Sequence, residues 1–486
     1  MSKASAPSAP NPSLDATDPA SLGLAAGARA IRSGDITSEK YTAALLQRAQ
    51  ALAELNTFIT IDPNAALEAA SAADKARAGG SATPLLGVPV GVKDSYLTKG
   101  LPTSLGIGAL TDFVPQENAA AVSAIAEAGA VILGKNNLVE MSYGLTGHNA
   151  RYGQVKNPHA RDRVSGGSSS GSAASVAAGI VPASLGGDTV GSIRVPASFC
   201  GVVGFKPTTG RWPREGVAPI SHTLDTTGVF ARTVEDCALM DHVVTGEHDG
   251  RQRSNAKNIK GIRLAYAPRQ FLELVDPEIE TRFHDVLRRL REAGAEIAEV
   301  DLGEDFSDLI QSTTWSIFFH ETAKAIPEFL LHHAIPTTFE EIYESLKPEL
   351  REAWGHRVLP GGGGAISAEA YQALLSVNRP EIQRRLDKVF RESEAILLPT
   401  TPTTAPLIEQ QASFPIAGRP VSSLALANHT VSASSVGLPG ISLPMGLSRG
   451  GLPMGLELDA PLHSDRALLS LARRIEGVLG SQPVLI

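Results

Sequence analysis

The centre of the chain holds a run of small residues that opens directly onto a helix pattern. Residues 165–172 read Ser-Gly-Gly-Ser-Ser-Ser-Gly-Ser and continue into the Ala-rich segment 173–179. A flexible linker has this composition, but a linker is flanked by domain ends and not by a helix. A Gly/Ser turn at a helix N-terminus presents backbone N–H groups to one point and favours an anion or oxyanion site. The run is not a phosphate-binding Walker loop, because no Gly-Lys-Ser/Thr follows it.

The same run also matches G-x-S-x-G, the nucleophile elbow of α/β-hydrolases, over residues 167–171. That match would make Ser169 the nucleophile of an esterase. The elbow requires a hydrophobic strand before it, whereas residues 157–164 read Asn-Pro-His-Ala-Arg-Asp-Arg-Val. Ser/Gly-rich sequence readily matches this pattern by chance, which weakens the case for an esterase. The esterase is therefore kept only as an alternative.

A second glycine-rich block follows. Residues 186–197 read Gly-Gly-Asp-Thr-Val-Gly-Ser-Ile-Arg-Val-Pro-Ala, and residues 199–208 read Phe-Cys-Gly-Val-Val-Gly-Phe-Lys-Pro-Thr. A tight turn from Gly186 to Ser192 brings backbone N–H groups together, as a developing oxyanion requires. Asp188 and Arg194 are placed to pair across this turn and to hold its shape.

Earlier in the chain, residues 87–94 alternate as Gly-Val-Pro-Val-Gly-Val-Lys-Asp. The alternation predicts a strand with its Val side chains on one face and Lys93 on the other, at the strand's end. Helix patterns begin at Ser38, which we expect to cap its helix, and extend over 65–78, 118–128 and 277–293. Further strands are predicted at 130–133, 295–300 and 396–399, with a hairpin formed by 437–447 and 451–458.

Because helices and strands alternate, the sequence predicts an α/β fold: a single large domain with a central mixed β-sheet flanked by helices. We expect the domain to cover residues 21–486, after a disordered tail at 1–20 that has no secretory signal. A helical insertion covers about 305–380, and four consecutive glycines at 361–364 predict a mobile loop within it.

Composition narrows the functional classes. Hydrophobic residues make up 43% of the 486, and the net charge is −8. The first figure excludes disorder over most of the chain, and the second disfavours a protein that wraps nucleic acid or an anionic membrane. No apolar run approaches the roughly 18 residues that span a bilayer. Two cysteines give no disulfide framework, and we expect a cytoplasmic protein.

These motifs resemble the amidase signature family. That family is marked by a Gly-Gly-Ser-Ser-x-Gly turn, a D-x-G-G-S-x-R-x-P-A block that leads to G-x-K-P-T, and a Lys at the end of a G-V-P-[VI]-x-[VI]-K-D strand. This chain supplies them at 166–171, 188–208 and 87–94, with Lys93 and Ser168 75 residues apart and Ser168 and Ser192 24 residues apart. The resemblance extends from about residue 20 to 480, with a signature core at about 80–235.

The resemblance implies an amidase, a hydrolase of linear amide C–N bonds that forms an acyl-enzyme. Ser192 would be the nucleophile, Ser168 a bridging serine on a cis peptide bond, and Lys93 the base. Backbone N–H groups of Thr189, Val190, Gly191 and Ser192 would hold the oxyanion, and Asp188 and Arg194 would support the site. A neutral Lys requires its pKa of about 10.4 to fall, which burial among apolar walls achieves. We expect no carboxylate near Lys93 to hold its charge.

Within the family, residues 135–144 (Lys-Asn-Asn-Leu-Val-Glu-Met-Ser-Tyr-Gly) most resemble indoleacetamide and mandelamide hydrolases. That resemblance implies a small aryl-acetamide as substrate. The helical insertion would lie near the substrate entrance, and its Trp315, Phe318 and Phe319 either line an acyl pocket or form a helix-face core. Val190 replaces the family's usual Gly, and we expect its side chain to narrow the pocket.

Two other functions remain open. One is that of the A subunit of a glutamyl-tRNA(Gln) amidotransferase, which shares the signature and acts in a complex. The other is a non-catalytic scaffold, although Lys93, Ser168 and Ser192 are all retained. We expect no cofactor and no metal, because there is no H-E-x-x-H and the adjacent His332 and His333 cannot share a helix face. A homodimer is left open, and structural roles are expected for His148, His159 and His222.

Overall fold

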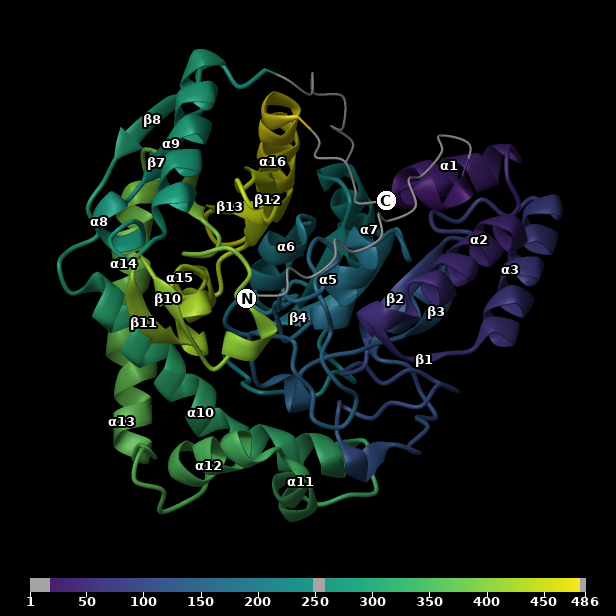
Figure 1. The fold of residues 1–486 in the computed structure, drawn as a ribbon, viewed down its shortest axis with the longest axis horizontal. Coiled ribbons are helices and arrows are strands. Elements are labelled where there is room, and N and C mark those ends of the chain that lie inside the picture. Colours follow the sequence, from purple (N-terminus) through teal and green to yellow (C-terminus); the bar gives the residue numbers. More distant parts are fainter. Residues whose placement is uncertain (1–17, 248–257, 481–486) are drawn as a thin grey trace, which may run out of the picture.

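An 11-stranded mixed β-sheet runs through the part of the chain that the computed structural model describes, residues 18–247 and 258–480 (Figure 1). The strand order is β1-β3-β2-β4-β6-β5-β12-β13-β9-β7-β8, and β10 and β11 form a separate hairpin. The strands are β1 Phe58–Ile61, β2 Pro89–Lys93, β3 Val131–Asn136, β4 Ala183–Asp188, β5 Val203–Lys206, β6 Thr226–Ala231, β7 Arg263–Tyr266, β8 Glu296–Glu299, β9 Ala395–Pro399, β10 Ser413–Ile416, β11 Arg419–Ser422, β12 Gly440–Leu447 and β13 Pro453–Asp459.

Helices cover both faces of the sheet. They are α1 Leu24–Ser33, α2 Ser38–Ala51, α3 Pro63–Ala78, α4 Ala120–Glu127, α5 Ser170–Ala177, α6 Arg194–Cys200, α7 Val234–Thr245, α8 Pro268–Phe271, α9 Pro277–Glu292, α10 Phe306–His332, α11 Phe339–Ser345, α12 Pro348–Arg357, α13 Ala368–Ala373, α14 Arg379–Phe390, α15 Val431–Val436 and α16 Asp465–Leu479. One hydrophobic cluster joins α4, α7, α9 and α16 to the sheet, and a second gathers α10, α12, α14 and α15. The predicted α/β fold is therefore confirmed.

The parallel part of the sheet positions the polar groups that matter here. Strand β2 pairs in parallel with β3 on one side and with β4 on the other. The carboxyl ends of parallel strands lie at the same edge of a sheet. Lys93 ends β2 and Asp188 ends β4, so the topology brings these two residues to one edge.

Most of the predicted elements are present, including β2, α9 and the β12–β13 hairpin, whose strands pair antiparallel. The cap of α2 was predicted wrongly: the Thr37 side chain accepts the Lys40 N–H, while Ser38 is buried and donates to the Gly87 carbonyl. Of the expected tail, residues 1–17 lie outside the described residues, but Ala20 is buried in a 3₁₀ turn. Residues 305–380, where the sequence predicts a helical insertion, contain α10 to α13, which lie along the lower edge of the view in Figure 1.

Candidate active site

The Lys93 ammonium group and the Ser168 hydroxyl meet at the carboxyl edge of the sheet. Lys93 Nζ lies 2.8 Å from Ser168 Oγ, and both side chains are buried. Ser168 follows a cis peptide bond from Gly167, in the Gly/Ser run that leads into α5. The two residues are 75 positions apart in the sequence, and the fold brings them into direct contact.

Burial lowers the pKa of Lys93 to about 7, while the carboxylates of Asp225 and Asp188 act in the opposite direction. The expectation that no carboxylate lies near Lys93 was therefore wrong. Burial still has the larger effect, because removing an ammonium group from water disfavours its charged form. Near neutral pH, a large fraction of Lys93 is thus the free amine that can accept a proton.

Ser192 lies in the turn that connects β4 to α6, next to the Gly/Ser run. The Ser169 N–H donates to the Ser192 carbonyl at 3.4 Å, which places the two segments side by side. The Asp188 carboxylate organises this turn by accepting the N–H groups of Gly191 at 2.7 Å and of Ile193 at 3.1 Å.

This contact bears on the four N–H donors that the sequence predicts for an oxyanion, which stay a prediction. Because the Gly191 N–H already donates to Asp188, it is not available to a substrate oxygen. Within residues 18–247 and 258–480, the N–H groups of Thr189, Val190 and Ser192 have no acceptor. Three of the four predicted N–H groups thus lack an acceptor among the described residues, and of these three residues Thr189 lines the cavity.

Arg194 holds the Asp188 carboxylate in place. Its Nη2 and Nε lie 2.9 and 3.0 Å from the two carboxylate oxygens, and its Nη1 lies 2.6 Å from Glu457 Oε1. All three side chains are buried. The Asp188 pKa is lowered even though burial acts to raise it, because the Arg194 guanidinium favours the charged carboxylate. The expected pairing across the turn is confirmed.

A cavity of about 400 Å³ reaches Lys93, Ser168 and Asp188, while Ser192 is not among the described residues of its wall. Its wall includes Lys93, Ser168 and Thr189 at the buried end, an apolar middle formed by residues 217–220, and Phe329 from α10. Its outer wall carries charged and titratable side chains, namely Arg214, Glu215, His222, Glu328, His332 and His333. A mostly apolar cavity with a few polar groups is typical of small-molecule sites, so this cavity fits a small ligand with an apolar body.

Several side chains singled out in the sequence lie outside this cavity. The wall, as far as the described residues form it, contains neither Val190 nor the aromatic residues of the first half of α10. Val190 is 2% exposed and belongs to a hydrophobic cluster, so the structure does not support the narrowing that we expected from it. Phe318 packs edge-on against Tyr143, and Trp315 and Phe319 border a different hollow.

The remaining candidates have identifiable contacts. The Ser169 hydroxyl donates to the Gly187 carbonyl and accepts the Gly187 N–H, and no described strand immediately precedes it, so the elbow prediction fails. His148 contacts Lys347, and His159 contacts the Cys200 carbonyl. Of the three histidines near the signature, only His222 lines the cavity.

Sequence reasoning missed Asp225. Its carboxylate accepts the Thr189 hydroxyl at 2.7 Å and the N–H groups of Ile220 and Ser221 at 2.8 and 2.9 Å. Asp225 directly precedes β6, which pairs antiparallel with β4 so that Thr226 faces Asp188. Only the pairing of β6 with β4 would have placed Asp225 near the site, and the local sequence pattern does not reveal that pairing.

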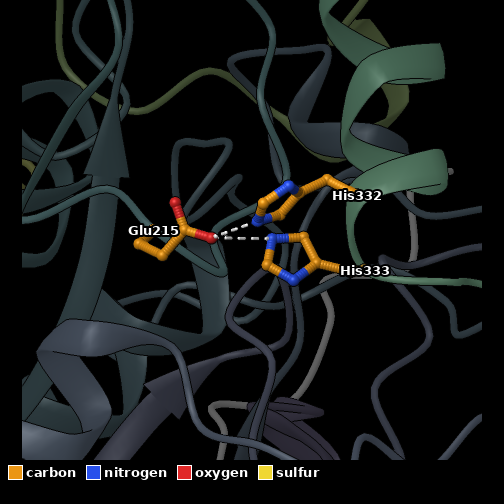
Figure 2. Close-up of side chains that lie close together, drawn as sticks. All are labelled: Glu215, His332 and His333. Atoms are coloured by element: carbon orange, nitrogen blue, oxygen red, sulfur yellow. Dashed lines mark ion pairs between the residues drawn. The ribbon is translucent and has the colours of Figure 1, made fainter.

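The outer wall contains a group of possible metal ligands. One oxygen of Glu215 lies 3.0 Å from His332 Nε2 and 3.4 Å from His333 Nε2 (Figure 2). The prediction that two adjacent histidines cannot converge holds only inside a continuous helix. Helix α10 ends at His332, and the backbone leaves the helix at His333, so both rings reach the same carboxylate.

Comparisons with known proteins show which family the whole chain resembles. The model of the Amidase family matches residues 40–469. Mandelamide hydrolase from Pseudomonas putida is 35% identical over 95% of this chain and 92% of its own length. The A subunit of the glutamyl-tRNA(Gln) amidotransferase from Chromohalobacter salexigens is 35% identical over 93% of this chain and 95% of its own length. A crystal structure of an amidase superposes with a TM-score of 0.84 and 30% identity, and covers 94% of this chain and 100% of that one.

None of the helices in residues 18–247 and 258–480 combines the length and apolar character that crossing a membrane requires.

Proposed function

The chain belongs to the amidase family and is an amidohydrolase that acts on C–N amide bonds, and from this premise we propose that it hydrolyses a primary aryl-acetamide to a carboxylate and ammonia. Ser192 is the nucleophile, Ser168 relays the proton, and Lys93 is the base. The observation that carries this assignment is the buried 2.8 Å contact between Lys93 Nζ and Ser168 Oγ.

The first half of the reaction forms an acyl-enzyme. Ser192 Oγ attacks the amide carbonyl carbon as its proton passes to Ser168 Oγ, and the Ser168 proton passes to the neutral Lys93 amine. A serine can do this because its hydroxyl donates and accepts at once. Lys93 then returns the proton through Ser168 to the amide nitrogen, the C–N bond breaks, and ammonia leaves.

The second half uses water in place of Ser192. Water attacks the acyl carbon while its proton travels along the same path to Lys93. The ester bond to Ser192 breaks, Ser192 recovers its proton, and the carboxylate product leaves. A base with a pKa near the working pH suits both proton transfers, since such a group can both accept and release a proton at low free-energy cost.

The negative charge on the carbonyl oxygen develops beside the turn that follows β4. The free N–H groups of Thr189, Val190 and Ser192 stabilise it, while Gly191 contributes conformation and not a donor. Donors that are fixed before the reaction act strongly in a site from which water is excluded.

Three features support a small aromatic acyl group. The cavity volume of about 400 Å³ lies within the range of small-molecule sites. Residues 217–220 and Phe329 give the cavity an apolar middle. The chain is also similar to a mandelamide hydrolase and, at 36% identity, to an indoleacetamide hydrolase.

A second candidate is glutamine amide hydrolysis within an amidotransferase, favoured by the equal 35% identity to the A subunit of a glutamyl-tRNA(Gln) amidotransferase. The two functions differ in whether the purified chain acts alone. We expect the full chain to release ammonia from mandelamide and indoleacetamide without partners and to leave glutamine intact. Hydrolysis of glutamine alone would instead assign the second function.

The residue roles are tested with matched serine variants. Ser192→Ala should lose activity by several orders of magnitude, and Lys93→Met should lose about 10²–10⁴-fold. Ser169→Ala is the control, because its hydroxyl contacts only the Gly187 backbone. After an acid quench during turnover, peptide mass spectrometry should locate the acyl group on Ser192. An acyl group on Ser169 would overturn the assignment in favour of the esterase.

A further inference from the structure

Three side chains at the outer end of the cavity converge without taking part in the proposed reaction. Glu215 comes from the segment before β6, and His332 and His333 come from the end of α10 (Figure 2). Both Nε2 atoms point at the same Glu215 oxygen, at 3.0 and 3.4 Å. All three potential donor atoms lie within 4.8 Å of one another.

These separations fit the ligands of one metal ion. Zn²⁺ binds His nitrogen at about 2.0–2.1 Å and carboxylate oxygen at about 2.0–2.2 Å in tetrahedral geometry. Two such ligands are then about 3.3–3.5 Å apart; the N···O separation of 3.4 Å lies in this range, and that of 3.0 Å is slightly shorter. Two histidines and one carboxylate form a known zinc ligand set that leaves the fourth position open.

The backbone that carries Glu215 is fixed. The Glu215 carbonyl accepts the Ala120 N–H at 3.0 Å, and the next carbonyl, of Gly216, accepts the Leu97 N–H at 2.9 Å. Gly216 has a φ of 75°, and a Cβ there would lie 2.6 Å from the Ala119 Cα. Fixed backbone favours metal binding, because the ligands then need little reorganisation.

The cluster is open to solvent at one side. The side chains of Glu215 and His332 are 65% and 69% exposed, whereas that of His333 is 18% exposed. An ion can therefore reach the cluster from bulk water and keep a water ligand. The same three residues belong to the cavity wall whose buried end contains Lys93 and Ser168.

We propose that Glu215, His332 and His333 bind one transition-metal ion of the Zn²⁺ class at the mouth of the cavity. Imidazole and carboxylate ligands together suit this class, while Mg²⁺ and Ca²⁺ prefer oxygen ligands alone. The bound ion and its water occupy the outer end of the cavity and so hinder access of an amide. The hindered access of an amide rests on the proposed function, whereas the metal site itself does not.

The site is tested by metal binding to the full chain after treatment with a chelator. Isothermal titration with Zn²⁺, and the visible absorption of added Co²⁺, should both give one equivalent for the wild type. Glu215→Gln, His332→Ala and His333→Ala should each weaken binding by more than the roughly 10–100-fold that loss of an outer-shell partner costs. His222→Ala is the matched control, because His222 lines the same cavity but pairs with Glu328. Equal thermal unfolding midpoints show that the variants fold.

Wild-type protein that binds no Zn²⁺, or variants that bind it like the wild type, would overturn the site and leave two imidazoles hydrogen-bonded to Glu215. Where binding holds, one equivalent of Zn²⁺ should lower kcat/KM for mandelamide in the wild type and not in the His332→Ala, His333→Ala double variant. Unchanged hydrolysis would overturn the hindrance alone. The metal titration uses no amide. Its result can therefore be interpreted even if the proposed amide hydrolysis is wrong.

Discussion

Lys93 and Lys135 lie on neighbouring parallel strands and are both fully buried, yet only Lys135 is held by a carboxylate. Lys135 Nζ lies 3.1 Å from Asp94 Oδ1 and donates to the Tyr96 carbonyl and the Thr103 hydroxyl, each at 2.7 Å. Lys93 Nζ contacts the Ser168 hydroxyl instead, and no described carboxylate lies within ion-pair distance of it. The fold thus compensates the charge of the Lys135 ammonium group and leaves Lys93 without such compensation, so that its neutral amine can accept a proton.

The two lysines should therefore differ in their effect on stability. Lys135→Met leaves Asp94 buried without its cation and should lower the free energy of unfolding by about 3–5 kcal/mol. Lys93→Met removes an amine whose burial disfavours its charged form, so the free energy of unfolding should stay at or above the wild-type value at pH 7. Urea unfolding followed by circular dichroism measures both. Equal losses in the two variants would contradict the distinction.

The pH dependence of amide hydrolysis should follow Lys93. Below a pKa of about 7 the amine binds a proton and cannot accept another, so kcat/KM should fall as the pH drops through about 7 and level off above it. Stopped assays of ammonia release from about pH 5 to 9 measure this limb. A limb at about pH 10, where an exposed Lys titrates, would show that Lys93 is not the base.

Asp225 should set the position of that limb. Its carboxylate raises the pKa of Lys93, so Asp225→Asn should move the limb to lower pH. An Asn side chain keeps the packing, since its amide oxygen can accept the Ile220 and Ser221 N–H groups and its NH₂ can donate to the Thr189 hydroxyl. Asp301→Asn is the control, because Asp301 is exposed and lies outside the cavity wall. If the pH at which kcat/KM falls is unchanged in both variants, Asp225 does not raise the pKa of Lys93.

Local patterns were enough to predict part of this site. The alternation at 87–94 identified the strand that ends at Lys93, and the two Gly/Ser-rich turns identified the segments that contain Ser168 and Ser192. These features depend on neighbours in the chain, so a sequence pattern records them. The pairing of Asp188 with Arg194 is equally local, since the two residues lie six positions apart.

The rest depends on contacts between distant segments. Asp225 reaches the site because β6 pairs with β4, and Phe329 reaches it because α10 lies against the cavity. No periodicity in the chain encodes which half of α10 lines the cavity, so Trp315 and Phe318 were as good candidates as Phe329. The convergence of His332 and His333 was missed because the exact end of a helix is hard to read from sequence.

Gly191 provides the sharpest test of the turn that contains Ser192. Its φ is 132°, and a Cβ at this position would lie 2.2 Å from the Thr430 hydroxyl oxygen, which also donates to the Val190 carbonyl at 2.5 Å. Gly191→Ala should therefore displace the free N–H donors and lower kcat by about 10²–10³-fold, the loss typical of one missing oxyanion donor. Gly210→Ala is the matched control, because Gly210 also has a positive φ, of 85°, but open space around its Cβ position. It should lose only stability, about 1–2 kcal/mol, and keep its kcat. If Gly191→Ala behaves like Gly210→Ala in steady-state assays of ammonia release, the turn does not hold the oxyanion.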